Sequence, residues 1–151
     1  MARSLLDLVD SLTATANSLS GHGDVKSNPI LDKVNAKVKS VVLVIVKNLT
    51  LKTPVDTSRA LSNWVVSLEA PTNYSIPAYY KGSYGSTQSA SAASAVSNAE
   101  SVLRTRKFGQ VVYITNNLRY IKPLNDGTIS KQGDHFVEAS ILLGRLEARR
   151  K

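Results

Sequence analysis

The feature that most constrains the fold is an apolar repeat between Asn28 and Thr53. Isoleucine, valine and leucine recur there every three or four residues, which is the spacing of one face of an α-helix. The repeat consists of Ile30, Val34, Val38, Val41, Ile45 and Leu49. Asn28 is a good N-cap, Pro29 suits the first helical position, and Pro54 disfavours helical geometry at Thr53. The sequence therefore predicts one long helix from Asn28 that ends at Thr53-Pro54.

The middle of this repeat, SVVLVIV at 40–46, has a second interpretation as a strand, because β-branched residues favour extended structure. The helical spacing runs through it without a break, which favours the helix. Since residues 41–46 are apolar on every side, we expect them to be buried on more than one side. Either the rest of the fold or a partner would cover them.

The N-terminal residues predict a separate amphipathic helix over 4–20, which Ser4 can cap. Its apolar positions are Leu5, Leu6, Val9, Leu12, Ala16 and Leu19. The sequence GHGD at 21–24 ends it in a flexible turn. We expect one domain over 1–151, in which residues 1–27 are this helix and turn or form a peripheral arm.

Two strands and a short turn are predicted next. The sequence SRALSNW at 58–64 should form a short helical turn capped by Asp56 or Thr57. A strand is expected at 64–69, where apolar and polar residues alternate, and another at 110–116.

Two more helices complete the predicted fold. The Ser- and Ala-rich segment 88–106 keeps helical spacing, so it predicts a helix with a thin face of small residues. A C-terminal helix is expected from about His135 to Arg150, with these residues facing inward: Phe136, Val137, Ile141, Leu142 and Leu146. The prediction is an α+β fold, in which a small antiparallel or mixed sheet packs against the long helix, the Ser/Ala-rich helix and the C-terminal helix.

Composition limits the classes of protein that fit. The chain of 151 residues has no cysteine, so disulfides and thiolate metal sites are excluded. The apolar run at 41–46 is far shorter than the ~20 residues that cross a bilayer, and Asp7 and Asp10 interrupt any secretory signal. These features predict a soluble protein that begins in a cytoplasm.

The net charge of +8 leaves two interpretations open. The tightest basic groups are Arg104, Arg106 and Lys107, and then Arg145, Arg149, Arg150 and Lys151. They are either solvated faces and tail ends or a nucleic-acid surface. No aromatic residues are interleaved with them, which weakens the case for single-strand binding.

Residues 71–87 are predicted to be a long loop, unusual in a compact domain and often functional. The loop holds four of the six tyrosines: Tyr74, Tyr79, Tyr80 and Tyr84. These side chains either pack back onto their own domain or form a contact arm, because tyrosine offers a large contact area at low entropic cost. Deletion of 74–84 would, on the second interpretation, leave a folded monomer that no longer assembles.

No catalytic or cofactor-binding pattern is present. The two histidines, His22 and His135, match no metal-ligand spacing, and His135 after Asp134 is better explained as an exposed helix cap. Neither nucleotide-binding glycine motif occurs. We therefore expect no enzymatic activity, no cofactor and no metal.

Two segments carry a resemblance to a known family. TPVDTSRALSNWVVSL at 53–68 and VYITNNLRYIKPLNDGTISKQGDHFVEASI at 112–141 resemble, in order and separation, two motif blocks of a bacteriophage family. These are the neck proteins of long-tailed phages, which complete the tail or join it to the head. Ser58 stands where the family prefers Gly, Ile121 where it prefers Ala, and Gly133-Asp134 where it has Ala-Pro.

The resemblance implies a structural virion protein that forms a ring, typically hexameric, at the head–tail junction. DNA would pass through the lumen without sequence-specific contacts, and no reaction would be catalysed. The neighbours would be the head connector or head-completion protein and the tail tube or terminator protein. Such a protein is assembled in the host bacterial cytoplasm and resides in the virion.

The motif residues are expected to be scaffold: Pro54, Asp56, Thr57, Arg59, Trp64, Asn116, Tyr120, Leu124 and Gly127. Trp64 would anchor the strand to the helices, Tyr120 would pin the exit of the second strand, and Gly127 would adopt a positive φ in a turn. Contacts with other subunits are expected from residues 41–46, the tyrosines of 71–87 and the chain ends, including Arg145, Arg149 and Arg150.

Two alternatives stay open. One is a small DNA-binding protein that uses the positive net charge, and its affinity would fall steeply with salt. The other is a tail-terminator or minor tail protein of the same structural class, because a fold does not settle the role.

Overall fold

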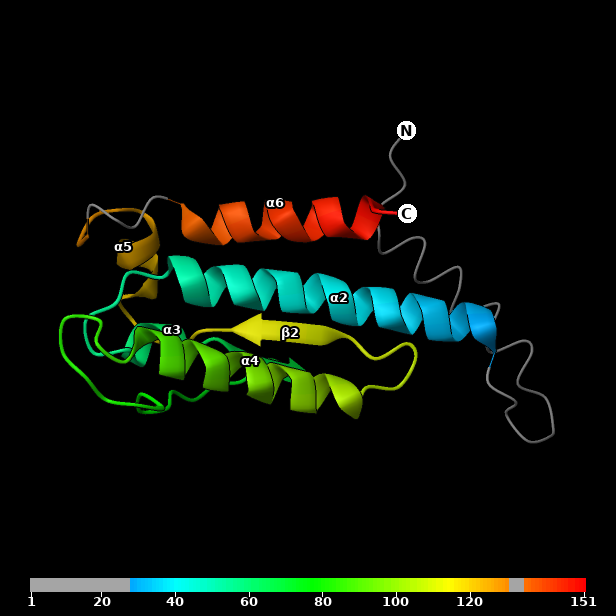
Figure 1. The fold of residues 1–151 in the computed structure, drawn as a ribbon, viewed down its shortest axis with the longest axis horizontal. Helices are drawn as coiled ribbons and strands as arrows, with labels where there is room; N and C mark the ends of the chain where they lie inside the picture. The colour runs from blue at the N-terminus through cyan, green and yellow to red at the C-terminus, as the bar shows by residue number, and fades with distance from the viewer. Residues whose placement is uncertain (1–27, 131–134) are drawn as a thin grey trace.

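A computed structural model describes residues 28–130 and 135–151. The elements in chain order are α2 (Pro29–Lys52), α3 (Arg59–Ser62), β1 (Val65–Leu68), α4 (Gln88–Arg104), β2 (Val112–Thr115), α5 (Ile121–Asn125) and α6 (Phe136–Arg149). This is the predicted α+β arrangement (Figure 1). The helix predicted at 4–20, the turn at 21–24 and Asp134 lie outside the described residues.

The long helix α2 forms as predicted. The side chain of Asn28 accepts a hydrogen bond from the Ile30 amide at 3.0 Å, Pro29 follows, and the helix ends at Thr53, whose amide bonds to the Leu49 carbonyl. Figure 1 shows α2 between α6 on one side and α4 with the sheet on the other. Val42 and Val46 in the middle of α2 are therefore buried by the fold itself, while Val41, Leu43, Val44 and Ile45 are partly buried.

The described part of the chain contains one small antiparallel sheet, in which Val66 of β1 pairs with Ile114 of β2. Because strand side chains alternate between faces, the face with Val66 and Ile114 packs inward. It meets Val46 of α2 and Leu103 of α4 in one apolar cluster. The small side chains of α4, such as Ala99, let that helix lie close to the sheet.

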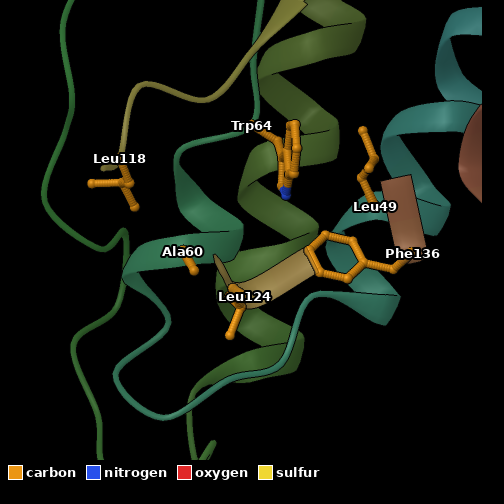
Figure 2. Packing of buried hydrophobic residues seen from close by; sticks show 6 residues of the cluster. All are labelled: Leu49, Ala60, Trp64, Leu118, Leu124 and Phe136. Carbon is orange, nitrogen blue, oxygen red and sulfur yellow. The ribbon is translucent and has the colours of Figure 1, made fainter. Parts of the chain in front are cut away.

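A second cluster joins the end of α2 to α3, α5 and the start of α6 (Figure 2). Its buried members are Leu49, Ala60, Trp64, Leu118, Leu124 and Phe136. The rings of Trp64 and Phe136 meet edge to face, with centroids 6.4 Å apart. The indole Nε1 of Trp64 donates to the Thr53 hydroxyl at 2.8 Å, so the one polar atom of this buried ring is satisfied.

The inward face predicted for α6 was wrong in part. Phe136 is buried, but Ile141, Leu142 and Leu146 are exposed, and the side of α6 that faces α2 carries Ser140 and Gly144.

The physical reason is the close approach of α6 to α2. A Cβ at Gly144 would lie 2.5 Å from the side chain of Ile45. Asn48 donates to the buried hydroxyl of Ser140 at 2.8 Å. Small residues therefore fill the contact, and the leucines turn outward.

Candidate interaction surface

Residues 71–87, called the tyrosine strap below, are an irregular segment whose backbone is fixed by buried side chains. Asn63 is 1% exposed. Its Oδ1 accepts from the Ile76 amide and its Nδ2 donates to the Ile76 carbonyl, both at 2.8 Å. Nδ2 also donates to the Arg59 carbonyl at 2.8 Å. One side chain therefore satisfies both backbone groups of Ile76 and holds the strap against α3.

Further ties hold the strap near Tyr80. Ser91 of α4 accepts from the Tyr80 amide at 3.1 Å and donates to its carbonyl at 3.2 Å. Thr87 donates to the same carbonyl at 2.7 Å, and Ser62 accepts from the Tyr79 amide at 3.2 Å. The strap thus has no secondary structure over most of its length but is hydrogen-bonded at several points.

The four strap tyrosines divide between the two interpretations made from sequence. Tyr79 is partly buried, and its hydroxyl accepts from Asn98 of α4 at 2.7 Å. Tyr74, Tyr80 and Tyr84 are 53%, 52% and 97% exposed. One tyrosine therefore packs on its own domain, while three project from a fixed backbone.

Tyr84 lies at the tip of the strap in an unfavourable backbone conformation. Its φ is +52°, a region that bulky L-residues rarely adopt. Asp56 holds this geometry, because its Oδ1 accepts from the Tyr84 amide at 2.8 Å and its carbonyl accepts from the Gly85 amide at 2.9 Å. The fully exposed ring is therefore positioned by two hydrogen bonds rather than by packing.

The predicted capping of the 58–64 turn was wrong. Asp56 binds the strap instead, and Thr57 is exposed. The residue in the N-cap position of α3 is Ser58, which has φ +62° and makes no side-chain cap bond. Its hydroxyl pairs with that of Thr87 at 2.9 Å, so this turn too is bound to the end of the strap.

The role predicted for Tyr120 was also wrong. Its side chain is 37% exposed, and its pKa is raised by partial burial, which outweighs the opposing charge of Arg59. The exit of β2 is held by Leu118, which is buried, and by Asn116, whose Nδ2 donates to the Ala60 carbonyl at 2.9 Å. Sequence reasoning placed the anchor on the aromatic residue and missed the leucine.

The turn after α5 does have the predicted conformation, with φ +72° at Gly127. Asn125, two residues before Gly127, has a function that the sequence did not reveal. Leu124 is buried, and Asn125 accepts from the Val137 amide at 2.9 Å, which caps the first turn of α6. Its Nδ2 donates to Glu138 at 2.9 Å, and this bond is the main cause of the lowered pKa of Glu138.

The basic groups gather at one end of the molecule. Arg106 bonds to Asn35 of α2 and to the Gln110 carbonyl, while Lys37 of α2 donates to the Arg150 carbonyl at 2.9 Å. The end of α4 and the end of α6 therefore lie on opposite sides of the first half of α2 (Figure 1). The exposed cations of this end, called the basic end below, are Lys33, Arg104, Lys107, Arg149, Arg150 and Lys151.

One member of the predicted basic groups differs from the others. Arg106 is 9% exposed, and burial lowers its pKa, so it is a structural residue rather than part of a surface. Arg145 is exposed on α6 like Arg149 and Arg150.

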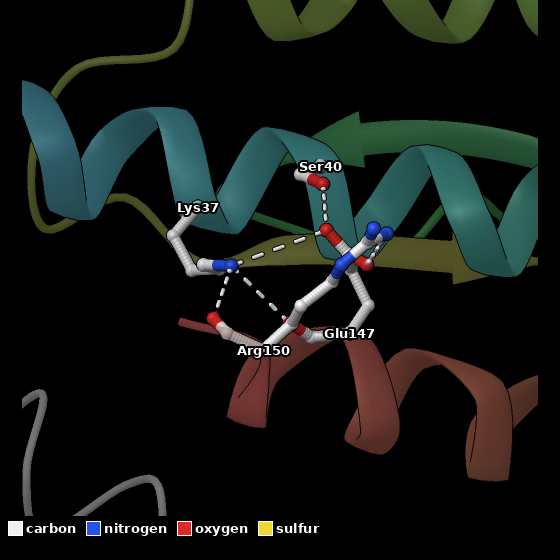
Figure 3. A network of polar contacts seen from close by, with 4 residues as sticks. All are labelled: Lys37, Ser40, Glu147 and Arg150. Carbon is white, nitrogen blue, oxygen red and sulfur yellow. Dashed lines mark hydrogen bonds and ion pairs between the residues drawn. The ribbon is translucent and has the colours of Figure 1, made fainter.

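Glu147 joins the basic end of α6 to α2 (Figure 3). The Ser40 hydroxyl donates to its Oε1 at 2.5 Å, and Lys37 and Arg150 lie 4.0 and 3.9 Å from its carboxylate oxygens. The pKa of Glu147 is lowered chiefly by the Ser40 hydrogen bond, with smaller effects from the two cations.

The described residues hold no cluster of three His, Asp or Glu side chains that could bind a metal ion. His135 is exposed with φ +48° and lies 3.8 Å from Glu138. A shallow pocket beside the strap is lined by Thr57, Arg59, Ser75, Ile76, Pro77 and Lys81, among others, and contains no acid–base pair. Among the helices described, none is both long and apolar enough to cross a membrane.

No protein-family model matches the chain, and no match was found among curated proteins or solved structures. The function is therefore inferred from the geometry above and from the resemblance of the two sequence segments.

Proposed function

We propose that this chain is a structural protein of a tailed bacteriophage, without enzymatic activity, that completes the tail and joins it to the head connector. In this proposal several copies form a ring, expected to be hexameric, in the neck of the virion. Its neighbours are the head-completion or connector protein and the tail tube or terminator protein. Assembly takes place in the cytoplasm of the host bacterium.

The observation that carries this proposal is the packing of the two resembling segments on each other. Ala60 and Trp64 come from 53–68, and Leu118, Leu124 and Phe136 come from 112–141, yet all lie in one buried cluster. Asn116 of the second segment bonds to the Ala60 carbonyl of the first. The two segments that resemble the family separately thus pack into one structural unit, and two of their motif residues, Trp64 and Leu124, are buried in it.

The backbone at Ser58 gives separate support. The family prefers Gly here, and Gly is preferred wherever a chain needs a positive φ. Ser58 has φ +62°. The serine that replaces the family's Gly therefore has the positive φ for which Gly is preferred.

The exposed tyrosines support an assembly role over catalysis. Tyrosine contributes large contact area with few rotatable bonds, and a fixed backbone lowers the entropic cost of binding. Tyr74, Tyr80 and Tyr84 meet both conditions.

The strap and the basic end lie at opposite ends of the molecule, as Figure 1 shows with the strap region drawn in green. A ring subunit could therefore contact a protein neighbour with the strap end and DNA phosphates with the basic end.

The first test is electron microscopy of a lysate from the encoding phage with a nonsense mutation in this gene. Filled heads beside separate tails are expected. Intact, infectious particles would contradict an essential joining role.

Complementation then tests the strap. Tyr84→Gly removes the exposed ring and relieves the positive φ, so the purified protein should be as stable as the wild type or up to about 1 kcal/mol more stable. It should nevertheless restore few particles. Ser83→Gly is the matched control, because it alters the adjacent exposed side chain, and it should complement fully. Full complementation by Tyr84→Gly would remove Tyr84 from the interface.

DNA binding is the second candidate function, favoured by the exposed cations of the basic end. If it were the main role, duplex affinity would fall steeply between about 50 and 200 mM salt. No detectable binding at about 50 mM salt would exclude it, while leaving the neck proposal intact.

A further inference from the structure

The shallow pocket beside the tyrosine strap is lined by positive charge without any negative charge. Its cations are Arg59 of α3 and Lys81 of the strap, and both residues are exposed. No Asp or Glu contributes to the lining. Asp56 is close in sequence, but its Oδ1 accepts from the Tyr84 amide at 2.8 Å and it does not line the pocket. A ligand that enters this pocket therefore meets two cations and no compensating carboxylate.

The polar groups of the pocket are not engaged elsewhere in the described chain. The ion pairs within residues 28–130 and 135–151 have Lys37, His135 and Arg150 as their cations, so neither cation of the pocket is paired there. The hydroxyls of Thr57 and Ser75 also line the pocket and form no hydrogen bond with these residues. Two cations and two hydroxyl donors are thus open to an anionic group.

The remaining lining is apolar. It consists of Ile76, Pro77 and Ala78, and the exposed Tyr74 and Tyr80 flank this segment in the sequence. The volume of about 460 Å³ lies in the range of roughly 300–1,000 Å³ that is usual for ligand pockets. An apolar surface with a few polar groups suits an organic ligand, whereas a nucleic-acid backbone is bound mainly by cations. The lining therefore favours a short acidic peptide over a phosphate chain.

The pocket is held in shape before any ligand binds. Buried Asn63 bonds both backbone groups of Ile76 at 2.8 Å, and it also donates to the Arg59 carbonyl at 2.8 Å. One side chain thus fixes the apolar segment relative to the helix that carries the arginine. Ser62 adds a bond from the Tyr79 amide at 3.2 Å. A preformed site loses less conformational entropy when a ligand binds.

We propose that this pocket binds an acidic segment of another protein. Arg59 and Lys81 pair with its carboxylates, and Ile76, Pro77 and Ala78 contact its apolar side chains. Arginine suits this role because its planar guanidinium can bind both oxygens of one carboxylate. The link to assembly rests on the proposed function, since the protein neighbour at the strap end would supply the acidic segment. Peptide binding by the purified chain and assembly of virions are measured separately, so that either can fail alone.

An NMR titration of the full, ¹⁵N-labelled chain tests the site. The probe is a blocked hexapeptide that contains three Glu or Asp residues and one Leu, and the control peptide carries Gln and Asn in place of the acids. The acidic peptide should shift the amide resonances of Thr57, Ala78 and Lys81, and the neutral peptide should not. No shift at these residues, or shifts confined to the basic end, would overturn the proposal.

Two charge-removing variants then test the cations. Arg59→Gln and Lys81→Gln should each weaken binding of the acidic peptide by about fivefold, because each removes one exposed ion pair. Lys52→Gln is the matched control, since Lys52 is an exposed lysine that does not line the pocket, and it should leave the affinity unchanged. Native emission of the buried Trp64 shows that a variant is folded, and if one variant misfolds the other decides. Equal affinity of wild type and the folded variants would refute the pairing.

A hexathymidylate in the same titration distinguishes carboxylate from phosphate. If it shifts Thr57, Ala78 and Lys81 and binds there more tightly than the acidic peptide, the pocket is a nucleic-acid site and the proposal is wrong. Oligonucleotide shifts confined to the basic end, with the acidic peptide in the pocket, support the proposal.

Discussion

Replacement of Asn63 should release the tyrosine strap and destabilise the whole domain. Asn63→Ala removes three hydrogen bonds, two to Ile76 and one to the Arg59 carbonyl. Each typically contributes about 0.5–1.5 kcal/mol, so the free energy of unfolding should fall by about 2–4 kcal/mol. The upper end applies if the backbone groups of Ile76 stay buried without partners, and the lower end if the strap moves into water and they are hydrated.

The assay is urea denaturation followed by fluorescence. Trp64 is the only tryptophan of the chain and is buried, so its emission reports the core directly. Limited proteolysis at Lys81, an exposed strap residue, reports release of the strap separately. In Asn63→Ala, cleavage at Lys81 should become faster under conditions where Trp64 fluorescence is still native.

Asn73→Ala is the matched control, since it makes the same change at an exposed asparagine of the same strap. It should alter stability by less than about 0.5 kcal/mol. An equally small effect of Asn63→Ala, with unchanged cleavage at Lys81, would refute the conclusion that Asn63 holds the strap.

Two further predictions concern the contact of α2 with α6. Gly144→Ala should destabilise by up to about 2 kcal/mol, because overpacking against Ile45 exceeds the gain of about 1 kcal/mol in helix propensity. In an Ile45→Ala background it should stabilise, and the same sign in both backgrounds would contradict the clash. Since the pKa of Glu147 is lowered below 4.5 in the folded state, its stabilisation is present above that value and lost as pH falls through the folded pKa. Glu147→Gln should therefore be less stable than wild type at pH 7 and approach it in acid, as pH-dependent urea titrations can show; an equal gap at both pH values would refute this.

The elements that sequence predicted well are those defined by local spacing. α2 and α4 follow from three- and four-residue repeats, and β1 follows from alternation, because each pattern reflects the geometry of one segment alone. The end of α2 at Thr53 was also predictable, since the restriction imposed by Pro54 acts on its immediate neighbour.

The errors arose where two segments meet. For α6, the apolar face was predicted to be the buried face. The helix lies so close to α2 that only small residues such as Gly144 fit in the contact. The spacing of a helix does not reveal how near its neighbour lies. Similarly, Asn63 looked like part of a short turn, and only the fold brings Ile76 to it across 13 residues. An asparagine next to a predicted buried tryptophan was the one available signal.

The geometry of the strap also changes how its role should be tested. Deletion of 74–84 was expected to leave a folded monomer, but it would remove Ile76 and Tyr80, the backbone partners of buried Asn63 and Ser91. The deleted protein would lose stability for reasons unrelated to assembly, so failure to enter particles would be uninformative. A substitution confined to the ring of Tyr84 changes no hydrogen bond of the strap, because its backbone amide makes the bond to Asp56. Loss of assembly with unchanged stability would then identify the exposed ring itself as the contact.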